Sequence, residues 1–410
     1  MNPYLSIIPV TLITIHYGIK SQFTELFIFF LLVLIFADNR AGLEAGMKMN
    51  RIIGIVLISL FTLKSKYFKS SLFLKNIKWL MPFWICLLIS WFFSPAEIKI
   101  QSFLRTISYG LLPLTVFGLF IPLFQEQPER IKNIIKLSLV SIVSGFLLYI
   151  LAPQYVQSVG EDNQLRISGL FGNANGLAIF SSFFSIIAWF AHKRLGLYTK
   201  NQFILLLLLY LLSILISGSR TSLGVFILFH GLTYIDTRKA SVRIVLKYFL
   251  TPLIVLGFTT IGISYINKST TLSDRARLET LETMGGRLIG WQWGYQQVPK
   301  ALWFGKGLMY DSHIYKISFS KKIRSVQRGL NSAFSGALAI LLDAGIIGTF
   351  FFIIFFIGMF KQFKDKRLVL PVLSGFILSF TFESWIMASL QPFTILFYVI
   401  IGLFQFKLTN

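Results

Sequence analysis

Apolar runs, each close to the length that crosses a lipid bilayer, recur through most of this 410-residue chain. A membrane-spanning helix needs about 20 mostly apolar residues. Candidate spans lie near residues 79–93, 102–124, 134–152, 167–191, 203–217, 220–235, 245–266, 333–360, 368–385 and 389–406, with shorter apolar pieces near 4–15, 23–37 and 51–63. The sequence therefore predicts an all-α polytopic membrane protein, a single domain over residues 1–410 with about 12 transmembrane helices.

The composition agrees with a membrane-embedded chain. Hydrophobic residues make up 55% and charged residues only 13%, whereas soluble domains have about 25% charged residues. A disordered chain and a collagen-like fibre are excluded, and a single cysteine, Cys86, excludes a disulfide scaffold. The N-terminus has neither a basic leading region nor a small-residue cleavage site, so we expect no signal peptide.

The formal net charge of +23 reflects basic loops rather than a nucleic-acid surface. Three to five basic residues occur in each of the loops 64–78, 125–136, 192–202, 236–247 and 361–367, and at most one in each of 94–101, 153–166, 217–220 and 386–391. Loops rich in basic residues alternate with loops poor in them, which is the positive-inside pattern of a membrane protein. The rich loops are therefore predicted to be cytoplasmic, and nucleic acid is not an expected partner.

A large hydrophilic loop, residues 267–330, is predicted on the extracytoplasmic side. It holds eleven basic and four acidic residues. Long loops cross membranes largely regardless of charge, so the loop is compatible with this topology. Its positive charge suits either an anionic substrate or lipid phosphates. Residues 274–283 could form a short amphipathic helix.

Familiar catalytic sets are missing from the sequence. The four histidines are not spaced as metal ligands. There is no phosphate-binding glycine loop and no nucleophile elbow. We therefore expect no metal and no cofactor, and we disfavour nucleotide-sugar transfer and phosphoryl transfer from ATP.

Polar residues at the predicted outer ends of spans are the remaining candidates for chemistry. Residues 166–176 read Arg-Ile-Ser-Gly-Leu-Phe-Gly-Asn-Ala-Asn-Gly, and Asn173 and Asn175 there could cap a helix or donate to a sugar or pyrophosphate. Residues 217–221 read Ser-Gly-Ser-Arg-Thr. Arg220, beside Ser219 and a helix N-terminus, is suited to bind an anion or to reach a lipid phosphate.

Further candidates follow along the chain. In Gly285-Gly286-Arg287, the arginine could clamp a phosphate, and Trp291 could stack on a sugar or lie at the membrane interface. Glu383 lies near the outer end of a span and could be either a functional acid or the ion-pair partner of an arginine. Arg105 has a similar position in an earlier span. Asp343 could be a buried helix-packing acid. His313 is either a solvated loop residue or a general base.

These motifs, taken in order, resemble those of the O-antigen ligase and O-antigen polymerase superfamily. The elements are Arg-x-x-Gly-x-Phe-x-Asn-x-Asn at 166–175, Ser-Gly-Ser-Arg-Thr at 217–221, Gly-Arg with a downstream tryptophan at 286–291, and Asn331-Ser332 leading to Leu-Asp-Ala-Gly-Ile-Ile-Gly at 342–348. The resemblance covers about residues 160–350. It implies a largely helical fold like that of other polyprenyl-phosphate-sugar transferases.

The resemblance implies a metal-independent glycosyltransferase in the bacterial inner membrane, acting on an undecaprenyl-pyrophosphate-linked glycan donor and a glycan acceptor. Arg220 and Arg287 match basic residues that engage the pyrophosphate, and Arg166 matches a basic position of polymerases. Asn173, Asn175, Ser219, Trp291 and Asn331 are then expected at the substrate. A chain-length regulator and a flippase are implied partners.

One position departs from the pattern. Ligases of this family have His-Asn where this chain has Leu330-Asn331, and leucine cannot accept a proton. The base would then be His313 or Glu383, or no strong base is needed. This favours a polymerase of O-antigen, capsule or exopolysaccharide repeat units over a ligase that transfers finished glycan to lipid A core. A membrane transporter is a further alternative, although intramembrane charges are sparse and no paired broken helices are evident.

Overall fold

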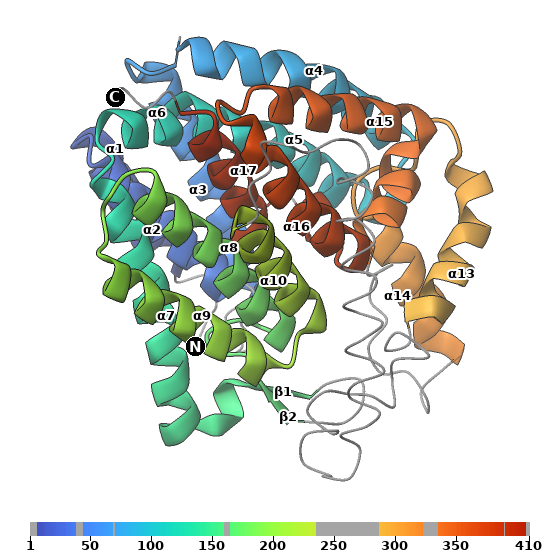
Figure 1. Ribbon diagram of the computed structural model, residues 1–410. Coiled ribbons are helices and arrows are strands. Elements are labelled where there is room, and N and C mark those ends of the chain that lie inside the picture. The colour runs from blue at the N-terminus through green and yellow to red at the C-terminus, as the bar shows by residue number, and fades with distance from the viewer. Residues whose placement is uncertain are drawn as a thin grey trace.

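The computed structural model describes residues 6–37, 44–68, 70–159, 165–234, 287–322, 335–388 and 390–406, which are mostly helical (Figure 1). The helices are α1 (Ile7–Ile19), α2 (Phe23–Ala37), α3 (Glu44–Lys64), α4 (Ser71–Phe92), α5 (Lys99–Thr115), α6 (Ile121–Glu126), α7 (Arg130–Leu151), α8 (Ala174–Lys193), α9 (Lys200–Ser217), α10 (Arg220–Tyr234), α13 (Arg287–Gln297), α14 (Tyr310–Lys322), α15 (Gly336–Lys361), α16 (Val369–Phe382) and α17 (Pro392–Phe404). The strands β1 (Gln157–Val159) and β2 (Leu165–Ile167) form an antiparallel hairpin.

Six of the described helices are long and apolar enough to cross a membrane. They are Ser71–Phe92, Ala96–Glu126, Arg130–Leu151, Ala174–Lys193, Lys200–Ser217 and Gly336–Lys361. The chain is thus a helical, multi-pass membrane protein, as the sequence predicts. The total of about 12 spans stays a prediction, and the expected span at 245–266 and helix at 274–283 lie outside the described residues.

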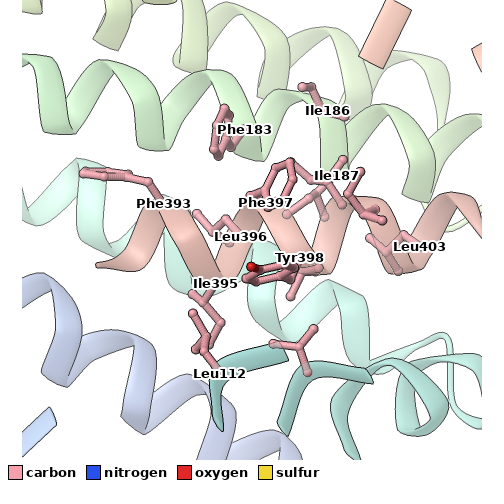
Figure 2. Packing of buried hydrophobic residues seen from close by; sticks show 14 of the residues in the cluster. Leu112, Phe183, Ile186, Ile187, Phe393, Ile395, Leu396, Phe397, Tyr398 and Leu403 are labelled. Atoms are coloured by element: carbon pink, nitrogen blue, oxygen red, sulfur yellow. The ribbon is translucent and has the colours of Figure 1, made fainter. Parts of the chain in front are cut away.

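Helix α17 lies at the centre of the bundle, between α8 and the α5 region (Figure 2). Every residue of α17 is buried, and its Phe397 packs against Phe376 and Trp385. A helix that is apolar on all sides belongs in a core. By contrast, α9 exposes Leu205, Leu208, Leu212 and Leu215, a face suited to lipid. The apolar runs therefore divide into an inner and an outer layer.

A buried polar cluster joins α4, α15 and α17 near the start of α4. Asn76 Nδ2 donates to Gln405 Oε1 at 2.8 Å, and Asn76 Oδ1 accepts from Gln405 Nε2 at 3.1 Å and from Gln362 Nε2 at 3.0 Å. These hydrogen bonds matter because a buried amide group left without a partner costs about 1–3 kcal/mol. This cluster fixes three helices to one another at one end of the bundle.

Among the described residues, contacts join basic-rich loops at this same end and basic-poor loops at the other. Arg194 pairs with Asp365, which joins the rich loops 192–202 and 361–367. Lys66 pairs with Glu126 at 2.7 Å, and these residues come from two further rich segments. At the opposite end, Arg166 contacts Gly218 and Asn175 contacts Glu383. The contacts therefore group the loops as the charge pattern predicts.

Two predicted spans differ from the sequence-based expectation. The span expected from residue 167 begins at Ala174, because Leu165–Ile167 pairs as a strand and Gly169 turns the chain with φ +58°. The span expected at 333–360 is broken at Gly345, whose φ of 69° and ψ of −172° are not helical. Only glycine adopts this conformation readily. The large loop also contains α13 and α14, which the sequence did not predict.

The topology can be tested with single cysteines, because the only native one, Cys86, is buried. Tyr155 is exposed beyond α7, and Lys200 is exposed at the start of α9. We expect a membrane-impermeant maleimide to label Tyr155→Cys in intact cells and Lys200→Cys only after permeabilisation. The unsubstituted chain is the control. Labelling of Lys200→Cys in intact cells would contradict the assigned orientation.

Candidate functional site

The first two sequence motifs meet through one hydrogen bond. Arg166, on β2, donates from Nη2 to the carbonyl oxygen of Gly218 at 3.0 Å. Gly218 ends α9 with φ 67°, and a left-handed residue at this place is usually glycine. A Cβ at residue 218 would lie 3.5 Å from the guanidinium of Arg166. The hairpin therefore lays a cationic side chain directly against the turn between α9 and α10.

That turn leads into α10 at Arg220, which is half-buried. Ser219 is buried, and its hydroxyl donates to Ser222 Oγ at 3.2 Å. The first N–H groups of a helix have no partner within the helix and attract anions. Arg220 thus stands at a helix end with Arg166 against the same turn. This arrangement of fixed positive charge and backbone donors suits a phosphate group.

The start of α8 contributes two asparagines with different partners. Asn173 is the N-cap, and its Oδ1 accepts from the N–H of Gly176 at 2.7 Å. Asn175 donates from Nδ2 to Glu383 Oε1 at 3.2 Å. Glu383 directly follows α16 and is 8% exposed. The structure therefore brings Asn175 and Glu383 together and gives Asn173 a structural role in addition to any contact with a substrate.

Helix α13 brings the large loop to the same helix end. The ring of Trp291 lies 5.8 Å from that of Phe382, the residue before Glu383. The indole nitrogen of Trp291 is buried and has no acceptor among the described residues. Such a donor is usually satisfied by water or a ligand. The packing thus places an aromatic face and a spare N–H close to the end of α16.

The other predicted residues are less closely tied to this site. Arg287 is the first residue of α13 rather than part of a turn, and its side chain lies outside the described part. His313 is half-buried on α14, and its ring forms no hydrogen bond with the described residues. Asn331 and Leu330 also lie outside the described residues. Within that part of the chain, no three His, Cys, Asp or Glu residues are grouped to hold a metal.

Sequence reasoning missed two of these contacts. The bond from Arg166 to Gly218 joins residues 52 positions apart, and neither motif contains a signal for the other. For Phe382, the one sequence signal is its position next to Glu383. Both contacts depend on how helix ends pack, which hydropathy does not report.

The capping role of Asn173 gives a stability prediction. Asn173→Ala should lower the free energy of unfolding by about 1 kcal/mol, because it removes the N-cap acceptor. Asn173→Asp should be at least as stable as the native chain, since it keeps the oxygen and adds negative charge at a helix N-terminus. Thermal unfolding in detergent measures both. Asn201→Ala, an exposed position of α9, is the control and should change little.

Comparison with known proteins supports the family resemblance that the sequence motifs indicate. A model of the O-antigen ligase family matches residues 205–353. No curated protein matches the sequence significantly. The matched segment contains Ser219, Arg220, Arg287, Trp291, His313 and Asn331, whereas Arg166, Asn173, Asn175 and Glu383 lie outside it. Residues 205–353 are therefore similar to the O-antigen ligase family, in line with the resemblance found in the sequence.

Proposed function

We propose that this protein polymerises undecaprenyl-pyrophosphate-linked oligosaccharide repeat units at the outer face of the bacterial inner membrane. The family match supports an O-antigen ligase or polymerase type of function in general. The observation that carries the finer proposal is the bond from Arg166 to Gly218, beside Arg220 at the start of α10. It gathers the cationic elements of two separate motifs at one helix end.

In this proposal the pyrophosphate of the donor lies at the turn between α9 and α10. Arg220 holds it, Arg166 and the buried Ser219 line the turn, and Arg287 approaches from the large loop. Negative charge grows on the pyrophosphate as the glycosidic bond breaks. Guanidinium groups and helix N–H groups stabilise that charge more in the transition state than in the bound donor.

The acceptor sugar lies on the opposite side of the anomeric carbon. Its hydroxyl oxygen forms a bond to that carbon, and the bond from the carbon to the pyrophosphate oxygen breaks. Glu383, held by Asn175 at 3.2 Å, takes the hydroxyl proton. Trp291 stacks on a sugar ring, with Asn173 and Asn331 as further contacts. Because Leu330 stands where ligases have histidine, Glu383 supplies the base.

The direct test is reconstitution in nanodiscs with undecaprenyl-pyrophosphate-linked repeat units and analysis of product length. A ladder of chain lengths is the expected result. The family description, O-antigen ligase, favours a second candidate function, namely transfer of glycan to lipid A core. Single transfer events that require added lipid A core, with no ladder, would establish the ligase instead. Neither product with a cognate donor would contradict both.

Arg220 is predicted to carry most of the stabilisation of the leaving group. Arg220→Ala should lower the polymerisation rate by about 10²–10³-fold, with normal amounts of protein in the membrane. Arg220→Lys should recover little, because an ammonium cannot form a two-pronged contact with phosphate. Arg367→Ala, which removes the same charge from an exposed residue at the other end of the bundle, is the control. Full-length polymer from Arg220→Ala would refute this role.

Glu383 is predicted to act as the general base. Glu383→Gln keeps an oxygen to accept from Asn175 but cannot take a proton, so kcat should fall by about 10²-fold or more. His313→Gln, which removes the other candidate base, should stay within a few-fold of the native rate. The rates come from the reconstituted assay. If the two variants behave in the reverse way, His313 is the base and Glu383 only holds Asn175.

A further inference from the structure

The break in α15 leaves four backbone groups without the hydrogen-bond partners that they would have in a continuous helix. Helical bonds join the N–H of residue i to the carbonyl of residue i−4, so a break at Gly345 frees the carbonyls of Leu342 and Asp343 and the N–H groups of Ile346 and Ile347. The segment 302–307 of the large loop forms a hydrogen bond with each of these four groups. The donors and acceptors are Lys306 N–H to Leu342 O at 3.1 Å, Gly307 N–H to Asp343 O at 2.9 Å, Ile346 N–H to Leu302 O at 2.8 Å and Ile347 N–H to Trp303 O at 3.1 Å.

The carboxylate of Asp343 adds a second attachment to the same loop. Its Oδ1 accepts from the N–H of Asp311 at 3.0 Å, and its Oδ2 accepts from the N–H of Met309 at 3.3 Å. These N–H groups belong to the first turn of α14 and the residue before it. Asp343 is 2% exposed, and both Asp311 of α14 and Arg105 of α5 act on it electrostatically. An acidic side chain from one helix therefore caps the N-terminus of another by accepting from two of its N–H groups.

Helix α14 in turn fixes α13. The hydroxyl of Tyr315 donates to the carbonyl of Gly290, and its ring packs edge-on against Trp293 with centroids 4.7 Å apart. Burial raises the pKa of Tyr315, so the hydroxyl keeps its proton and remains a donor. A small separate core of Ile98, Ala301, Tyr310, Tyr315, Leu338 and Leu342 fills the space between these helices and α15.

We propose that Asp343 is a positioning residue for glycan transfer: it holds the N-terminus of α14 and thereby sets α13, with Trp291, against the end of α16 beside Glu383. The expected effect of Asp343 on the transfer rate rests on the proposed function. Its expected effect on the position of the loop rests only on the contacts described above. Asp343 contacts no group assigned to the substrate. Its influence passes through Tyr315 and Gly290 to Trp291 and Phe382.

Hydrogen–deuterium exchange of the full chain in nanodiscs tests the anchoring step without any substrate. Asp343→Ala removes both acceptors and should raise exchange in peptides spanning residues 302–316 by about tenfold or more. Asp343→Asn keeps one acceptor oxygen and should give a smaller increase. Asn76→Ala, which breaks buried hydrogen bonds at the other end of the bundle, should lower thermal stability and leave exchange in 302–316 unchanged.

Transfer rates test the functional step on the same proteins. We expect kcat to fall about tenfold in Asp343→Ala and less in Asp343→Asn. The KM for the donor should rise by a smaller factor, because Arg166, Ser219 and Arg220 lie outside the loop and stay in place, whereas Arg287 belongs to α13. Asn76→Ala molecules that remain folded should keep their kcat. Unchanged exchange in Asp343→Ala, or increased exchange with an unchanged kcat, would overturn the proposal. If the native protein makes no polymer, the proposed function is refuted. The exchange comparison needs no substrate and would still decide whether Asp343 anchors the loop.

Discussion

A helix broken within a membrane must find partners for its freed backbone groups inside the protein, since lipid offers none. In this chain the break at Gly345 is paired by residues 302–307. The pairing also explains why neither glycine at its centre could carry a side chain. A Cβ at Gly345 would lie 2.4 Å from the carbonyl of Trp303, and one at Gly305 would lie 2.3 Å from that of Asp343. The large loop is therefore attached to the bundle by backbone contact.

This attachment helps to hold α13 at the outer end of the bundle, where other elements also meet. The end of α16 is contacted by α8 through Asn175 and by α13 through Trp291. The hairpin separately brings Arg166 to the turn before Arg220. The cationic elements thus come from the hairpin and the α9–α10 turn, and the carboxylate comes from the end of α16.

The sequence allowed the helical membrane architecture and the grouping of loops to be predicted, because apolar length and basic charge act locally. Asn175, Glu383 and Arg220 became candidates because polar groups at the ends of spans are costly unless they are paired, and their roles at a site stay predictions. The sequence did not reveal the break at Gly345, since glycine occurs in membrane helices for several reasons. Nor did it reveal that Arg166 meets Gly218, because the two motifs lie far apart along the chain.

The placement of Glu383 shows how the inner helices make a buried acid tolerable. An uncompensated carboxylate away from water is strongly disfavoured. Glu383 lies where α16 has ended, and it accepts a hydrogen bond from Asn175 in the first turn of α8. Helix α17, which is buried throughout, and the largely buried α8 hold this geometry, because close apolar packing leaves them little freedom to shift.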